Sequence, residues 1–256
     1  TAAVGEGGYS FDIRPFMMRC NDADNITDPD SWGEPERVKP AAGDTSCLQV
    51  MSLDMTYFEA GGKCFVSWAD KTQENLSKVF IATVDPEDPT QLTSKATVIT
   101  TPEYSWECVN IAVNEGSAAF VKDGTVYLAF SAAATGAEYC VGLMTADADA
   151  DLTDASNWTK VPYPVLTSGD FNDELCGPGH NSFTTDEYGN LVIVYHARPA
   201  EEHAGHSGDP LYDACRHAYV KPVLFDCEGA PVLLLSDEGC AMGGCAITVK
   251  VKVSGA

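Results

Sequence analysis

A hairpin pattern occurs three times in this chain, and it constrains the fold more than any other feature. In each copy a polar, titratable residue begins a strand-like run, which is followed by a tight turn and a second strand-like run. The three polar residues are Asp54, Glu115 and His180, which are 61 and 65 residues apart. The turns carry residues that favour β-hairpins, namely Gly61-Gly62, Asp123-Gly124 and Gly189-Asn190.

A hairpin repeat of this length, roughly 60 residues, predicts the blades of a β-propeller. The first strand of each blade then lines a central channel, so that equivalent residues of successive blades face one another. Runs of β-branched and aromatic residues bounded by Gly, Pro, Asn and Asp dominate, which predicts an all-β chain. The alternative is a β-sandwich in which three unrelated hairpins carry polar residues in their turns. Because spacing, turn and polar position recur together, the pattern favours the propeller.

The sequence divides into three parts. Residues 1–10 are small and polar and predict a tail or linker, residues 11–236 hold the hairpin units, and residues 237–256 predict a connector and a C-terminal strand. The loop NITDPDSW at residues 25–32 has a near copy, DLTDASNW, at residues 151–158, about two repeats later. We therefore expect residues 11–40 to be the last part of a blade whose start is missing. The whole chain then holds about three and a half blades.

Charge and hydropathy exclude two classes of partner. The formal net charge of −23 repels phosphate backbones and anionic lipid, so nucleic acid and membrane are not expected partners. The apolar runs are too short to span a bilayer. A neutral ligand such as a carbohydrate is compatible with this surface.

Cysteine usage favours a secreted or extracellular protein. The chain has ten cysteines and no Cys-x-x-Cys, so the zinc-ribbon and thioredoxin spacings are absent. An even number suits disulfides in an exported protein. Cys240 and Cys245 are the expected local pair, whereas Cys64 and Cys140 lie in strand-like runs where free thiols are common.

Two carboxylates and a histidine on one axis suit the hydrolysis of glycosidic bonds. An inverting glycosidase needs a general acid and a general base whose carboxyl groups lie about 6.5–9.5 Å apart. Glu115 is the candidate acid, and Asp54 is expected to raise its pKa and to orient it. His180 is expected either to contact sugar hydroxyls or to hold an axial cation through water. The alternatives are a turn carboxylate that caps backbone amides for each acid, and a hydrogen-bonded structural residue for His180.

Further residues are candidates for contact with substrate or metal. Arg216 is expected to begin an inner strand pair, residues 216–225, and to lie beside the acids. Trp106 is a candidate sugar-stacking platform, with ordinary core packing as the alternative. His203 and His206 have a spacing that would suit zinc, but a solvated loop is favoured.

The sequence resembles glycoside hydrolase family 43, the α-L-arabinofuranosidase and β-xylosidase type, from about residue 11 to residue 236. The segments that carry the resemblance include SLDMTYFEAGGKCFVSWA, VNEGSAAFVKDGTVYLAFSA, GPGHNSF and DPLYDACRHAYVKP. The resemblance implies a five-bladed propeller and an inverting reaction. It implies Glu115 as the acid, Asp54 as the residue that modulates its pKa, and His180 as the central histidine, which in many members lies near a calcium or other axial ion. It also implies that Arg216 lies near the sugar.

The sequence departs from the family pattern in three places. Ser117 stands where a proline is usual, Met55 stands where an alanine is usual, and the catalytic base is missing. The family base is an Asp on the inner strand of the first blade, and that blade should precede Phe11. Asp28-Pro29 has the right dipeptide, but its copy at Asp154-Ala155 identifies it as a loop position.

Two functions follow from this pattern. The first is an inverting hydrolase of arabinose- or xylose-containing plant polysaccharides or oligosaccharides, with its base on a missing N-terminal segment or a second chain. The second is a non-catalytic carbohydrate-binding or structural propeller that has lost its base. A protein-interaction module built on a remodelled propeller is a weaker third possibility.

Overall fold

The computed structural model describes residues 2–5, 13–49, 51–71, 76–206 and 208–233, and for residues 2–5 the backbone alone. The described part is almost entirely β-structure, as the sequence predicted, with the single short α-helix α1 (Ala200–Gly205). Among these residues no helix is long and apolar enough to cross a membrane. The predicted C-terminal strand and the Cys240–Cys245 pair lie outside the described residues.

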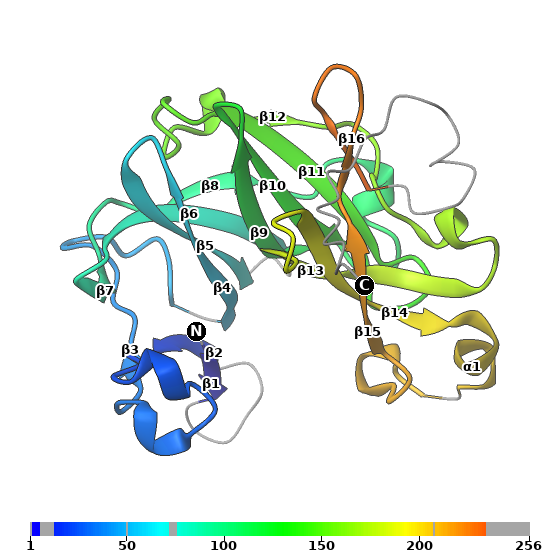
Figure 1. Cartoon of the computed structure of the whole chain (residues 1–256), viewed down its shortest axis with the longest axis horizontal. Helices are drawn as coiled ribbons and strands as arrows, with labels where there is room; N and C mark the ends of the chain where they lie inside the picture. Colours follow the sequence, from blue (N-terminus) through cyan, green and yellow to red (C-terminus); the bar gives the residue numbers. More distant parts are fainter. Residues whose placement is uncertain (1, 6–12, 50, 72–75, 207, 234–256) are drawn as a thin grey trace, which may run out of the picture.

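Four antiparallel sheets follow one another along the chain and spread as a fan (Figure 1). The first sheet contains β1 (Ala2–Gly5), β2 (Ile13–Met17) and β3 (Glu36–Arg37). The second contains β4 (Met51–Ala60), β5 (Lys63–Lys71), β6 (Ser77–Asp85), β7 (Asp88–Leu92) and β8 (Thr97–Thr100). The third contains β9 (Asn114–Lys122), β10 (Thr125–Ala132), β11 (Cys140–Asp147) and β12 (Thr159–Lys160). The fourth contains β13 (Leu175–Thr185), β14 (Leu191–Pro199) and β15 (His217–Pro222), and a small hairpin of β16 (Leu224–Phe225) and β17 (Pro231–Val232) follows it.

The inner strands of the last three sheets lie next to one another. Strand β9 is flanked by β4 on one side and by β13 on the other, and each of the three is the first strand of its sheet. The hairpin turns lie where the sequence predicted them. Gly61, Gly62, Asp123 and Gly124 adopt left-handed φ angles between 50° and 78°, as a two-residue hairpin turn requires.

Apolar side chains fill the three interfaces between successive sheets. Strand β10 shows the pattern, because Val126, Leu128 and Phe130 pack toward the second sheet whereas Tyr127 and Ala129 pack toward the fourth. Both faces of such a strand are buried, which explains why its sequence is almost continuously apolar.

The two similar loops occupy equivalent places in the first and third sheets, as predicted. Each follows a strand (β2 or β11), forms a 3-10 helix capped by an Asp side chain (Asp28 or Asp154), and leads into a short strand (β3 or β12) that pairs back. In each loop the Trp indole donates a 2.9 Å hydrogen bond to a backbone oxygen six residues earlier. Strands β2 and β3 therefore correspond to the last two strands of the third sheet.

This correspondence corrects the prediction of a tail for residues 2–5, and the rest of the predicted tail lies outside the described residues. Residues Ala2–Gly5 form β1, which pairs with β2 as β10 pairs with β11. Within the described part of the chain, no strand fills the place next to β1 that β9 fills next to β10.

The predicted inner pair at residues 216–225 was also wrong. Strand β15 is third from the centre of its sheet, paired only with β14, and β16 pairs with β17. Most residues of β15 are exposed, and from this segment Tyr219, Val223 and Phe225 pack against the core of the fourth sheet.

The eight cysteines of the described part are all free thiols. Cys140 is buried, which agrees with its expected place in a strand.

The two similar loops show how burial of a Trp side chain affects stability when its hydrogen bond stays the same. Trp158 is 8% exposed and Trp32 is 38% exposed, although each donates the same kind of hydrogen bond. We expect Trp158→Ala to lower the free energy of unfolding by about 3–5 kcal/mol, because it empties a core position. Trp32→Ala should cost about 1 kcal/mol. Urea denaturation followed by circular dichroism measures both, and equal losses would contradict the assigned core.

Candidate active site

The structure brings the three repeated polar residues together. Asp54, Glu115 and His180 each offer one ligand or proton-carrying atom, and these atoms lie within 4.8 Å of one another. They come from β4, β9 and β13, the three adjacent inner strands. Residues far apart in sequence thus form one cluster, as the repeat predicted.

A β-bulge lies at this point in each inner strand. The pairing register shifts between Leu53 and Thr56 in β4, opposite Ala129 and Ser131 in β9, and on both sides of Gly179 in β13. The left-handed residues of the bulges include Asp54 (φ 58°), Gly116 (φ 57°) and His180 (φ 47°). A bulge re-aims a side chain out of the regular alternation of a strand.

The bulges also refine the predicted equivalence of the three residues. Asp54 and His180 share one position, whereas Glu115 precedes that position by one residue and Gly116 occupies it. A side chain on residue 116 would meet the His180 ring, because a Cβ there would lie 3.3 Å from Nδ1. Glycine therefore leaves the space in which the histidine sits.

Burial raises the pKa of Glu115, and the nearby Asp54 carboxylate raises it further. A hydrogen bond from Tyr139 Oη, at 2.9 Å from Oε1, acts in the opposite direction. A carboxylic acid in such surroundings keeps its proton to a higher pH than in water, which is the state a general acid needs.

A buried polar network holds the strand just before Glu115. The Asn114 amide donates to Glu107 Oε1 at 3.0 Å and its oxygen accepts from Thr100 Oγ1 at 2.8 Å. The Lys160 ammonium lies 2.5 Å from Glu107 Oε1, and Glu107 is fully buried. Because every member is paired, the network fixes the start of β9.

Asp54 is oriented from two sides. Its Oδ2 accepts the Gly116 backbone N–H at 3.2 Å, and its Oδ1 lies 3.7 Å from His180 Nε2. Burial raises the pKa of Asp54, while His180 and the Gly116 N–H act to lower it. The side chain is 13% exposed, so the carboxylate faces the cluster rather than bulk solvent.

His180 is the accessible member of the cluster, with a side chain that is 48% exposed. Its backbone N–H donates to Ser131 Oγ at 2.7 Å, which ties the fourth sheet to the third. The ring can therefore reach a ligand while its backbone stays fixed.

Three neighbours of the acids were not predicted: Tyr139, Ser131 and His196. Ser131 pairs with Glu115 across the hairpin, so the Asp123-Gly124 turn and strand register could have identified it. Tyr139 lies just before β11 and carries no such signal. His196 stacks on Tyr139 with ring centroids 5.4 Å apart, and burial followed by the Arg216 charge lowers its pKa to about 3.

Arg216 and Trp106, the two other predicted contacts to substrate, interact with residues other than the two carboxylates. Arg216 precedes β15 and acts electrostatically on His196 and Arg198. Trp106 stacks between Tyr104 and Phe130, each with centroids 6.2 Å away, and its indole donates to the Pro162 carbonyl at 3.2 Å. This packing matches the alternative that the sequence left open for Trp106.

His203 and His206 lie beside the Asp213 carboxylate rather than in a free loop. His203 Nδ1 is 3.4 Å and His206 Nδ1 is 3.7 Å from its oxygens, and the buried Arg198 lies 3.3 Å away. Hydrogen bonds from Cys215 lower the pKa of Asp213. Within the described residues, the one His/Cys/Asp/Glu group compact enough for a metal is that of Asp54, Glu115 and His180.

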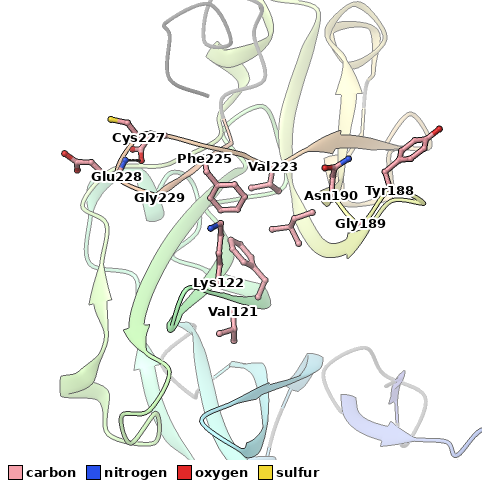
Figure 2. A pocket seen from close by; sticks show the side chains of 13 residues that line it. Val121, Lys122, Tyr188, Gly189, Asn190, Val223, Phe225, Cys227, Glu228 and Gly229 are labelled. Carbon is pink, nitrogen blue, oxygen red and sulfur yellow. Dashed lines mark hydrogen bonds between the residues drawn. The ribbon is translucent and has the colours of Figure 1, made fainter. Parts of the chain in front are cut away.

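A separate groove of about 810 Å³ lies at the other end of the inner strands (Figure 2). Lys122 lies over the Phe225 ring there, 4.8 Å from its centroid. Lys122 is seven residues from Glu115 along β9, which corresponds to about 23 Å in an extended strand. The groove is therefore distinct from the cluster of acids.

Comparison with known proteins places the chain among glycoside hydrolases. It is 34% identical over 232 residues to an extracellular exo-α-(1→5)-L-arabinofuranosidase of Streptomyces avermitilis, covering 90% of this chain and 45% of that protein. It is 39% identical over 178 residues to an enzyme of the same name from Streptomyces chartreusis, covering 68% of this chain and 52% of that protein. The chain thus spans about half the length of the curated relatives it matches.

A solved structure and a family profile agree with these relatives. The crystal structure of an α-L-arabinofuranosidase from Lactobacillus brevis superposes with a TM-score of 0.77 at 35% identity, over 86% of this chain and 65% of that one. The profile of the Glycosyl hydrolases family 43 matches residues 8–231. The chain belongs to glycosyl hydrolase family 43, as its sequence resemblance predicted.

Proposed function

We propose that the chain forms the larger part of a five-bladed propeller that hydrolyses arabinose-containing plant polysaccharides or oligosaccharides with inversion. The observation that carries the proposal is the pair of carboxylates, Glu115 and Asp54, which converge with His180 from three inner strands. The curated relatives at 34% and 39% identity are named arabinofuranosidases, which favours arabinofuranosides over xylosides. Their names also include "extracellular", which supports secretion of this protein.

Glu115 is the general acid in this mechanism. It donates its proton to the oxygen of the leaving sugar as the anomeric C–O bond breaks, while a water molecule adds to the opposite face of the ring. Asp54 lies within 4.8 Å of Glu115, which is shorter than the gap of about 6.5–9.5 Å that an inverting pair needs for water and sugar. Asp54 therefore raises the pKa of the acid and orients it, and a third carboxylate serves as base.

The base is expected outside the described inner strands. The place next to β1, equivalent to that of β9, would put an Asp across the channel from Glu115, but no described strand fills it. We propose that a preceding segment or a second chain supplies this strand.

His180 and Arg216 are the proposed contacts to sugar hydroxyls. The half-exposed ring of His180 suits this role directly. Arg216 would act from the His196 side of the cluster. Trp106 is the weakest candidate platform, because both its neighbouring rings and its indole N–H are already engaged.

An axial calcium ion fits the observed donors only through water. Calcium takes about six to eight oxygen ligands, whereas the cluster offers two carboxylates and an imidazole. Direct coordination would also neutralise the charge that Asp54 exerts on Glu115. An ion beside His180 is therefore proposed as a hydrated ion that takes no step in the reaction.

A non-catalytic carbohydrate-binding or structural propeller is the second candidate. The observation that favours it is that no strand of the described residues occupies the place next to β1. The two candidates differ in whether a base is supplied from elsewhere.

Glu115→Gln tests the acid. The amide keeps the shape but cannot donate the proton, so we expect kcat/KM for arabino-oligosaccharides to fall by about 10²–10⁴-fold. The loss should be much smaller on p-nitrophenyl α-L-arabinofuranoside, whose leaving group needs little protonation. Glu187→Gln, in an exposed far turn, is the control and should match the wild type. An equal loss on good and poor leaving groups would refute Glu115 as the acid.

Asp54→Asn tests the electrostatic coupling. The Asp54 charge raises the pKa of Glu115, so its removal lowers that pKa and Glu115 loses its proton at lower pH. We therefore expect the alkaline limb of the kcat/KM–pH profile to move to lower pH. A limb that stays in place, or moves to higher pH, would show that Asp54 does not modulate the acid.

Addition of the missing segment separates the two candidate functions. We expect the 256-residue chain alone to be inactive, because an acid without a base leaves the attacking water unactivated. An upstream segment with one Asp on its inner strand should restore hydrolysis, and NMR should detect the inverted anomer first. Ordinary turnover by the pure, monomeric 256-residue chain would place the base within it and overturn the proposal. Continued inactivity with a strand-forming segment would favour the binding module.

A further inference from the structure

Two hydrogen bonds and a close approach of side chains connect the backbone of His180 to the carboxyl group of Glu115. The His180 N–H donates to Ser131 Oγ at 2.7 Å. Ser131 Oγ and the edge of the Tyr139 ring both lie against Gly179, and Tyr139 Oη donates to Glu115 Oε1 at 2.9 Å. A phenolic hydroxyl has one proton, so the bond to Glu115 uses the donor capacity of Tyr139.

Tyr139 is clamped so that its hydroxyl cannot turn away. The residue is 1% exposed, and its ring stacks on His196 with an interplanar angle of 4°. Gly179, the register partner of His196, lies against the ring edge: a Cβ at Gly179 would come within 2.3 Å of Tyr139 Cε1. That distance is too short for any side chain, so glycine at residue 179 leaves the space that the Tyr139 ring occupies.

We propose that Tyr139 is a positioning residue that holds Glu115 by Oε1 and so leaves Oε2 to carry the proton to the leaving sugar. A donated hydrogen bond at Oε1 disfavours a proton on that oxygen, since the same site would then have to donate as well as accept. Ser131, the register partner of Glu115, accepts the His180 N–H and so joins the strand of the acid to the neighbouring sheet. This inference rests on the proposed role of Glu115 as the general acid.

The chain offers a matched control for the tyrosine hydroxyl. Tyr195 is also 1% exposed and aromatic-stacked, but its hydroxyl has no hydrogen-bond partner. Tyr139→Phe and Tyr195→Phe therefore remove the same atom from equally buried rings, and only the first loses a contact with the acid.

Kinetics on the hydrolytically active form of the protein are the first measurement. We expect Tyr139→Phe to lower kcat for arabino-oligosaccharides by about 10²-fold, the size of effect produced by a misplaced reacting group. KM should stay nearly constant, and the loss on p-nitrophenyl α-L-arabinofuranoside should be far smaller. Ser131→Ala should show the same dependence on leaving group with a smaller loss, and Tyr195→Phe should match the wild type.

Crystal structures of the variants are the second measurement and need no activity. The Glu115 carboxyl group should leave its position in Tyr139→Phe and keep it in Tyr195→Phe. If wild-type protein hydrolyses no arabinoside or xyloside, the proposed function fails while the structures still decide the positioning role. If wild-type protein is active but Tyr139→Phe behaves as Tyr195→Phe in kinetics and structure, the positioning role is overturned. If Tyr139→Phe alone fails to fold, an unmoved Glu115 and wild-type kinetics in Ser131→Ala overturn it.

Discussion

The site depends on a backbone constraint that recurs in three neighbouring strands. A regular strand alternates its side chains between two faces, and in the second and third sheets both faces are packed against other sheets. A polar side chain in regular alternation would thus enter an apolar interface. The bulges at Asp54, Gly116 and His180 break the alternation and direct the polar groups along the centre of the fan. Asp, Gly and His all tolerate the left-handed conformation better than β-branched residues do.

Interface packing explains why the site needs several sheets at once. Four sheets in a fan have three interfaces, and each of the three apolar clusters fills one of them. A closed ring has as many interfaces as sheets, so the two end sheets of the described fan lack one neighbour each (Figure 1). Val220, an apolar residue on β15 of the fourth sheet, is 60% exposed, which is consistent with a face that no described sheet covers. The cluster of acids lies on the inner strands, so a further sheet that closed the ring would also complete the walls around them.

The sequence predicted the parts of this structure that repeat and missed the parts that occur once. Hairpin turns, the duplicated Trp loops and the convergence of Asp54, Glu115 and His180 all follow from spacing, because equivalent positions share one geometry. Tyr139 could not be predicted, since it lies in the segment before β11, outside the repeated hairpin, and its neighbours Gly179 and His196 belong to another repeat. The outer place of β15 was missed because its sequence is strand-like, and a strand-like run alone does not tell an outer strand from an inner one. The one-residue offset of Glu115 depends on where each bulge lies, which spacing alone does not resolve.

The electrostatics of the cluster assign one proton to one carboxyl group. Burial raises the pKa of both Asp54 and Glu115, and two carboxylates this close resist joint ionisation. The negative charge of Asp54 is stabilised by the hydrogen bond from the Gly116 N–H and by His180, whose Nε2 lies 3.7 Å from Oδ1. Glu115 has one neutral donor, Tyr139, and the Asp54 charge raises its pKa, whereas Lys71 and His180 act to lower it. In the proposed mechanism the shared proton therefore resides on Glu115, while the Gly116 backbone amide supports the charge of Asp54. The proposed division of roles between two chemically similar acids thus depends on the backbone of β9.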